Sequence, residues 1–560
     1  MRVVGLRIGL SVLAGALLFL AVPSYGLWPL MWIAAVPEIY VARVAATPKR
    51  AFLYGWLTGA VAHTGGFYWM DGLLERFGHM APIEALPIMA LLIAYQGLAF
   101  AFFSWGLRRA WDRTGAPLVL LAPLVMVAVE LLMPQIFPYY LAISQAFVPA
   151  VIQIADLTGP LGVTALMLAF AGAAADLVFS PARARRSWRA WRGMAIVGLL
   201  IAGDLGYGAL RMHQADVRRA AAPKVRTGLV QANVGILEKW DPEEFARLLV
   251  LHQRASADLQ RAGAELVVWP ESSYPYALPR TFAHDFAADD GRMVRRGFDT
   301  SLMFGAVTRA EKEAKKGPDR YPYNTAIMMD AAGHATGSYD KVFLMMFGEY
   351  VPFYDQIPWF TEIFPEASNF SRGSEPASFP LHTDAGDFKL GPLICYEDIL
   401  PSFARRVAKL GPNAFVNITN DAWFGRTAEP YQHLALAVFR SVEHRLEMVR
   451  AVNTGVSAHI DAAGRVLQAT ESVDPDEQPV ASPKTLLADL AMLPGGGLYR
   501  TVGDLFGFLS LLSLVALLAW KGGGPAAARS ATSEAAASEA AASDASTSDA
   551  STSDEEKTDT

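Results

Sequence analysis

Cysteine is nearly absent from this sequence, and charged residues are few. The single cysteine, Cys395, excludes an intramolecular disulfide and any metal site built from several cysteines. It is therefore either an inert buried side chain or a working thiol. Charged residues make up only 18 % of the 560 residues, and neither half of the chain has the basic face with interleaved aromatics that nucleic acid requires. We expect no nucleic-acid partner.

Cofactor motifs are missing as well. The sequence contains no P-loop, no convincing dinucleotide fingerprint and no cluster of metal ligands. We therefore expect an activity that uses no cofactor and no metal ion.

Apolar residues are abundant instead. They make up 52 % of the chain and dominate residues 1–212 and 501–520. A helix needs about 20 mostly apolar residues to cross a bilayer, so eight membrane spans are predicted, at 5–22, 27–44, 51–70, 82–107, 117–134, 149–179, 193–211 and 501–520. His63, Glu130 and Asp156 are polar residues near span ends, where they are either functional or interfacial.

Basic residues gather in alternate loops between these spans, near residues 43–50, 108–113 and 183–192. By the positive-inside rule these loops are cytoplasmic, as are both termini. The segment between spans seven and eight then lies on the opposite face, the periplasm of a Gram-negative bacterium. The sequence predicts a multi-pass protein of the bacterial inner membrane.

Four regions follow from this pattern. They are an N-terminal bundle of seven spans at 1–212, a periplasmic domain at 213–490, a final membrane helix at 491–521 and a tail at 522–560. The tail is rich in Ala, Ser, Thr and acidic residues, so we expect it to be disordered and cytoplasmic.

The periplasmic domain alternates strand and helix patterns, which is typical of an α/β fold. Strands are predicted at 225–234, 265–269, 302–308, 324–329, 389–394, 414–418 and 455–460. Helices are predicted at 241–262, with Asp241 as N-cap and Pro242 in the first turn, and at 399–409 and 430–449.

Three reactive side chains follow apolar runs in this domain: Glu271, Lys341 and Cys395. In a packed sheet they could converge on one edge. A thiol with an ordinary pKa of about 8.5 needs a base or a nearby cation to attack a carbonyl at neutral pH. Glu271 could take the proton, and Lys341 could favour the thiolate and stabilise the oxyanion together with a backbone N–H. Taken singly, such a cysteine is more often inert core than catalytic, and the two charges would usually be surface charges or a weak ion pair.

The segments around these residues are VVWPES at Glu271, YDKVFLMMFGEYVPF from Tyr339 onward and ICYED at Cys395, with VQANV, EKW, VNITNDAWFG and RSVEHRLEMVRAVNTGVS elsewhere. Together they resemble the nitrilase, or carbon-nitrogen hydrolase, superfamily. More narrowly, residues 1–520 resemble the apolipoprotein N-acyltransferase family, the membrane-bound branch of that superfamily. The resemblance implies a nitrilase-like αββα sandwich attached to a helical membrane bundle.

The resemblance also implies roles for individual residues. Glu271 would be the general base, Lys341 the stabiliser of the tetrahedral intermediate and Cys395 the acylated residue, supported by Glu349. Trp240, Tyr396 and Glu397 match positions important to activity or substrate contact. One stretch departs from the family, because Met345 and Met346 stand where the family reads close to L-V-P-F-G-E-Y.

The implied reaction moves an acyl chain from a phospholipid such as phosphatidylethanolamine, through a thioester on Cys395, to the α-amine of a diacylated apolipoprotein. Residues 343–360 and the pair Trp423 and Phe424 are candidate lids over that thioester. Two alternatives stay open at this stage. One is a membrane-tethered amidase that hydrolyses a small amide, and the other is a catalytically silent lipid-binding scaffold.

Overall fold

The computed structural model describes residues 2–23, 25–76, 78, 80–311, 318–352, 369–473 and 483–520. The predicted tail at 522–560 and residues 353–360 of the first candidate lid lie outside this range.

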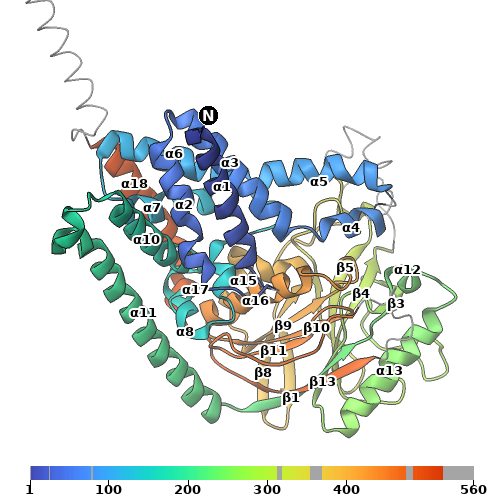
Figure 1. Ribbon diagram of the computed structural model, residues 1–560. Helices are drawn as coiled ribbons and strands as arrows, with labels where there is room; N and C mark the ends of the chain where they lie inside the picture. Colours follow the sequence, from blue (N-terminus) through green and yellow to red (C-terminus); the bar gives the residue numbers. More distant parts are fainter. Residues whose placement is uncertain are drawn as a thin grey trace, which may run out of the picture.

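The N-terminal part of the chain is helical. Its elements are α1 (Arg2–Leu20), α2 (Leu30–Val44), α3 (Pro48–Gly66), α4 (Met70–Arg76), α5 (Pro82–Gln96), α6 (Leu98–Thr114), α7 (Leu118–Leu132), η1 (Leu141–Gln145), α8 (Pro149–Ile152), α9 (Ala155–Thr158), α10 (Pro160–Phe179), η2 (Ala184–Arg186) and α11 (Trp188–Ala221). Two C-terminal helices, α17 (Leu498–Val502) and α18 (Leu505–Ala519), pack against them. These helices form a bundle on one side of the sheets (Figure 1).

Within the described residues, four helical stretches are long and apolar enough to cross a membrane: α1, α5 with α6, α10 and α11. The helices α7 and α18 are apolar but shorter, so the count of eight spans stays a prediction. The predicted span at 149–179 is wrong as a single helix. Gly159 interrupts the helix between α9 and α10, because its φ is 65°. Glycine adopts this left-handed conformation readily.

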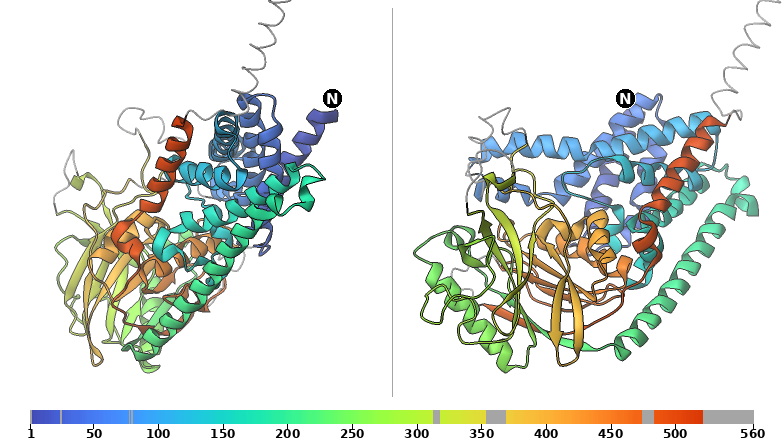
Figure 2. Two further views of the ribbon diagram at one scale, coloured as in Figure 1. Left: turned by 90° about the vertical axis from the view of Figure 1, so that its left-hand side faces the viewer. Right: turned by 180° about the vertical axis from the view of Figure 1, so that it is seen from behind.

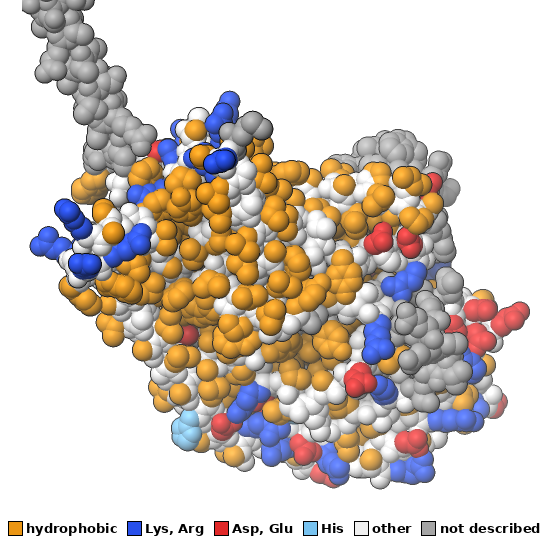
Figure 3. All heavy atoms as spheres, viewed as in Figure 1, with side chains coloured by type: hydrophobic (Ala, Val, Ile, Leu, Met, Phe, Trp, Pro, Cys, Tyr) orange, Lys and Arg blue, Asp and Glu red, His pale blue; other side chains and the backbone are white. Residues whose placement is uncertain are grey.

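Hydrophobic side chains cover most of the bundle surface in Figure 3, whereas charged side chains cover the sheet domain below it. Lysine and arginine side chains also gather at the helix ends farthest from the sheets. An exposed apolar surface of this extent needs a covering, and lipid is the covering that suits helices with exposed leucines along their length.

Two sheets make up the domain that follows. Their strands are β1 (Lys224–Gln231), β2 (Leu266–Val268), β3 (Tyr274–Pro279), β4 (Ser301–Arg309), β5 (Tyr323–Met329), β6 (Ala335–Asp340), β7 (Phe379–Thr383), β8 (Gly386–Ile394), β9 (Ala414–Thr419), β10 (Glu447–Val452), β11 (Ala458–Ile460), β12 (Val466–Ala469) and β13 (Lys484–Ala491). The first sheet has the order β13-β1-β2-β4-β5-β6, with β3 paired to β4, and the second has the order β12-β11-β10-β9-β8-β7.

The two sheets pack face to face, with β1 and β13 against β10 and β6 against β7. Helix α13 (Phe245–Arg261) packs on the first sheet, and α15 (Pro401–Lys409) packs on β8 of the second, beside α16 (Glu429–His444). Short helical turns, α12 (Ile236–Lys239), η3 (Pro318–Arg320) and η4 (Cys395–Ile399), lie in the connections. The domain is thus the αββα sandwich that the resemblance implied.

Two predicted helices of this domain have different bounds in the structure. The predicted helix at 430–449 ends at His444, because Arg445 turns left-handed with a φ of 52°, and the chain continues as strand β10. All six residues of β10 are buried, so its sequence lacks the alternation that marks a half-exposed strand. Helix α13 begins at Phe245 rather than near Asp241, because residues 242–244 form a turn.

A buried ion cluster joins the bundle to the sandwich. Asp156 Oδ2 in α9 lies 2.6 Å from Arg211 Nη2 in α11 and 2.7 Å from Arg445 Nη2 beyond α16. The hydroxyl of Tyr207 donates to Asp156 Oδ1 at 2.8 Å. Asp156 therefore has a structural role at the junction.

The substitution Asp156→Asn is expected to destabilise the fold by about 3–5 kcal/mol, because it leaves two arginines without their buried counter-charge. Thermal unfolding of the full chain in detergent measures the effect. The matched control is Asp489→Asn, whose exposed pair with Arg226 spans 3.9 Å and is worth less than about 1 kcal/mol. Equal midpoints for the two variants would contradict the structural role of Asp156.

Candidate active site

Three strand ends bring the predicted reactive residues together. Glu271 follows β2, Lys341 follows β6 and Cys395 opens η4 at the end of β8. The Nζ atom of Lys341 lies 3.1 Å from Oε1 of Glu271, and the charges of both residues act on the Cys395 thiol. Their exposed fractions are 6 % for Glu271, 1 % for Lys341 and 9 % for Cys395, so the charges interact with little solvent screening.

Glu349 and Asn324 complete the surroundings of the lysine. Glu349 Oε2 lies 2.8 Å from Lys341 Nζ. The Asn324 amide donates to Glu271 Oε1 at 2.7 Å and to Glu349 Oε1 at 2.9 Å. The backbone N–H of Met345 also donates to Glu349, at 2.8 Å, so the loop that departs from the family pattern still holds this glutamate against the lysine.

The pKa values follow from this arrangement. Burial alone would raise the pKa of Glu271, but the charges of Lys341 and Lys239 lower it below its ordinary value. Burial alone would lower the pKa of Lys341, but Glu271 and Glu349 raise it well above its ordinary value. The two groups are therefore ionised together at neutral pH.

For the Cys395 thiol, the effect of burial outweighs that of the neighbouring cation. Burial raises the pKa of Cys395 well above its ordinary value, and the charge of Glu271 adds to this, although Lys341 opposes it. Lys341 was expected to favour the thiolate. Its charge does lower the pKa of Cys395, but burial and Glu271 outweigh this effect. The resting thiol is protonated at neutral pH, so attack on a carbonyl would require a base. Glu271 is an ionised carboxylate whose charge acts on this thiol.

The turn that begins with Cys395, η4, is held by Glu397. Its Oε1 accepts the backbone N–H of Val342 at 2.7 Å and that of Phe343 at 3.1 Å, and its Oε2 accepts the N–H of Ile394 at 2.9 Å. The Tyr339 hydroxyl donates to Oε1 at 2.6 Å. Glu397 thus fastens the segment after Lys341 to the segment before Cys395, which itself has a left-handed φ of 50°.

The other two predicted residues lie differently. Tyr396 donates its hydroxyl to the backbone carbonyl of Ile136 in the helical part at 2.8 Å. Trp240 is 46 % exposed, and its ring centroid lies 5.6 Å from Lys239 Nζ. Trp240 is therefore partly open to solvent, whereas Tyr396 ties the turn that carries Cys395 to the bundle.

Sequence reasoning missed two polar residues of the site. Lys239 is buried and donates to the backbone carbonyl of Glu271 at 2.9 Å; burial lowers its pKa to about 8, against the charges of Glu271 and Cys395. Lys239 stands in the EKW segment, but nothing local separates it from a surface lysine. Asn324 is the second residue of β5, and its inward direction depends on how β5 pairs with β4.

Gly305 lets the Glu271 turn approach β4 closely. A Cβ atom at this position would lie 2.4 Å from the backbone nitrogen of Ser272 and 2.7 Å from Cα of Glu271. A larger residue would therefore displace the glutamate.

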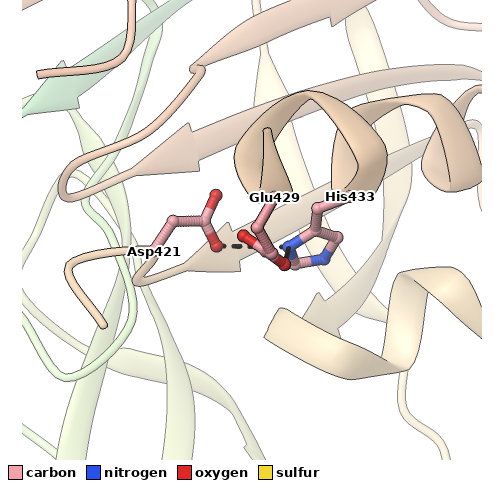
Figure 4. Close-up of side chains that lie close together, drawn as sticks. All are labelled: Asp421, Glu429 and His433. Atoms are coloured by element: carbon pink, nitrogen blue, oxygen red, sulfur yellow. Dashed lines mark hydrogen bonds and ion pairs between the residues drawn. The ribbon is translucent and has the colours of Figure 1, made fainter. Parts of the chain in front are cut away.

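The side chains of Asp421, Glu429 and His433 form a second polar cluster (Figure 4), and the charge of Asp421 acts on the Cys395 thiol. One ligand atom from each residue lies within 4.8 Å of the others. Among the described residues, this is the group whose donor atoms could surround a metal ion.

Comparison with known proteins gives matches over most of the chain. The model of the apolipoprotein N-acyltransferase N-terminal domain matches residues 14–173, and that of carbon-nitrogen hydrolase matches residues 226–487. The apolipoprotein N-acyltransferase of Geobacter metallireducens is 31 % identical over 522 residues, covering 91 % of this chain and 95 % of the relative. That of Azotobacter vinelandii is 34 % identical over 472 residues, covering 82 % and 86 %. Among solved structures, a mutant amidase from Nesterenkonia sp. AN1 is 22 % identical, with a TM-score of 0.33, and covers 48 % of this chain and 94 % of that chain.

Because the pKa of the Cys395 thiol is raised, the rate of its alkylation by iodoacetamide should still increase with pH above about 8.5, the ordinary pKa of a thiol. The substitution Lys341→Met should slow alkylation of Cys395 at pH 8 by about tenfold, because it removes the cation whose charge opposes the rise of the thiol pKa. Intact mass measures the adduct without ambiguity, since the chain has one cysteine. Lys389→Met, an exposed position on the strand that leads to Cys395, is the matched control. An alkylation rate that levels off below pH 8 in the wild type would contradict the protonated resting thiol.

Proposed function

Because the chain belongs to the apolipoprotein N-acyltransferase family, we propose that it transfers an acyl chain from a phospholipid to the α-amine of the diacylglyceryl cysteine at a lipoprotein N-terminus. The observation that carries the proposal is the buried Glu271, Lys341 and Cys395 set beside an apolar helical bundle. An acyltransferase that works on membrane-anchored substrates needs both parts.

In the first half-reaction, Glu271 takes the proton of the Cys395 thiol as the sulfur attacks the ester carbonyl of the phospholipid. Lys341 stabilises the oxyanion of the tetrahedral intermediate, and buried Lys239 adds positive charge beside it. Collapse of the intermediate breaks the ester bond. The leaving alkoxide takes the proton from Glu271, giving a lysophospholipid and a thioester on Cys395.

In the second half-reaction, the α-amine of the lipoprotein attacks the thioester carbonyl and Glu271 takes the amine proton. Collapse breaks the C–S bond, the thiolate recovers a proton from Glu271, and the product is an amide. One site serves both substrates in turn, so the kinetics are ping-pong. The donor is a phospholipid such as phosphatidylethanolamine.

The membrane setting of the proposal follows the charge pattern. Eight spans, both termini in the cytoplasm and a periplasmic domain at 213–490 would place the chain in the inner membrane of a Gram-negative bacterium. Basic side chains at the helix ends farthest from the sheets support this orientation (Figure 3). A thiol at the bilayer surface avoids the cost of extracting an acyl chain, about 0.8 kcal/mol per CH₂.

Water must be kept from the thioester if an amine is to accept the acyl group. Phe424 of the second candidate lid lies against the bundle, with its ring centroid 5.1 Å from that of Trp69. A lid built on this contact would shield the thioester from water.

Incubation of the purified full chain with phosphatidylethanolamine should add one fatty-acyl mass to the wild type and none to Cys395→Ala. A diacylated lipopeptide with a free α-amine should then remove the adduct, because it accepts the acyl group. Intact mass spectrometry measures both steps.

The control is hydrolysis of a small amide under the same conditions. A folded wild type that forms no acyl adduct at Cys395 would contradict the transferase proposal. Amide hydrolysis without an adduct would favour the tethered amidase, and the absence of both activities would favour the scaffold.

A further inference from the structure

The Asp421, Glu429 and His433 cluster lies on elements that lead directly to Cys395. His433 is in the second turn of α16, Asp421 follows β9, and a third carboxylate, Asp398, lies in the nucleophile turn η4 three residues after the cysteine. Figure 4 shows the imidazole of His433 pointing from the helix toward Asp421. All of these side chains are buried.

Each ring nitrogen of His433 contacts a different carboxylate. Nε2 lies 2.9 Å from Oδ1 of Asp398, and Nδ1 lies 3.1 Å from Oδ1 of Asp421. An ionised carboxylate only accepts hydrogen bonds, so both nitrogens must carry a proton and the ring is an imidazolium. Burial alone would lower the pKa of His433, but the charges of Asp398 and Asp421 raise it to about 10.

The charges of the cluster balance without a metal ion. Arg450 on β10 pairs with the second oxygen of Asp398, so two cations face two aspartates. Glu429 Oε1 lies 3.9 Å from His433 Nδ1, and burial, with the charge of Asp421, raises the pKa of Glu429 well above its ordinary value, which keeps it neutral. Within the described part of the chain, one oxygen each of Asp421 and Glu429 has no hydrogen-bond partner. A cation there would have to displace a proton from a nitrogen that already donates to Asp421.

We propose that His433 is a positioning residue for the reaction, because its imidazolium joins the nucleophile turn at Asp398 to the Asp421 loop and offsets the Asp421 charge that acts on the Cys395 thiol. This inference rests on the proposed function insofar as Cys395 is the nucleophile. The charge of Asp421 raises the pKa of Cys395 alongside the charges of Glu271 and Glu349, whereas Lys341 lowers it, and Lys239 interacts with the same thiol. Among the residues that the structure describes, His433 is the cation paired with Asp421.

The pH dependence of Cys395 alkylation tests the role without requiring a substrate. The substitution His433→Gln keeps an amide donor but removes the charge, so the profile should shift to higher pH and the rate at pH 8 should fall about tenfold. His433→Lys restores a positive charge and should recover most of the rate. The matched control is His459→Gln, a buried histidine paired with Glu447 at 2.8 Å, which should leave the profile unchanged.

Two further measurements keep the proposal open to refutation if His433→Gln does not fold. Asp421→Asn removes the carboxylate itself and should shift the alkylation profile to lower pH. Elemental analysis of the purified chain should find no stoichiometric metal. An unchanged profile in Asp421→Asn, a profile of His433→Gln equal to the wild type, or one metal ion per chain would each overturn the role of His433. Failure of the proposed function would show instead as a wild type without an acyl adduct, whatever the His433 variants do.

Discussion

An ammonium group buried inside a protein requires carboxylates around it, and the architecture of this site follows from that requirement at Lys341. Its side chain is 1 % exposed, and removing such a charge from water costs several kcal/mol unless partners compensate. Glu271 and Glu349 supply the charge and Asn324 orients both carboxylates. The ends of β2 and β6 and the 345–349 loop must therefore meet at one point. Glu397 then ties this point to the turn that carries Cys395.

The same arrangement explains how the site handles protons. The ion pair fixes Glu271 as a carboxylate, while burial keeps the neighbouring thiol protonated. A carboxylate and a protonated thiol thus coexist in the resting site. Under the proposed function, the thiol proton moves to Glu271 only when a carbonyl is present to receive the sulfur. Under the role proposed for His433, its imidazolium limits how far the charge of Asp421 raises the pKa of the Cys395 thiol.

Much of this was visible in the sequence, because Glu271, Lys341 and Cys395 each end an apolar run and the strands around them alternate with helices. The parts that were not visible depend on contacts between distant segments. The pairing of β5 with β4 directs Asn324 into the site, and Lys239 is buried there. Neither feature can be read from the local sequence pattern. Strand β10 is buried throughout, so its composition does not separate it from the preceding helix. The break at Gly159 depends on one backbone angle inside an otherwise continuous apolar run.

The attachment of the sandwich to the helices has a consequence for which bond of a lipid can react. Tyr396, the residue next to Cys395, donates a hydrogen bond to the carbonyl of Ile136. Gln432, the residue next to His433, accepts a hydrogen bond from Trp69 and donates one to the carbonyl of Gly66. Helix α11 leads into the sandwich and packs on α10, whereas α18 follows the sandwich and packs on α7 (Figure 2). The sulfur is thus held at one height relative to the helices. Under the proposed function, the two ester groups of a phospholipid, which lie at different depths, would be told apart by position along the membrane normal rather than by the shape of a pocket.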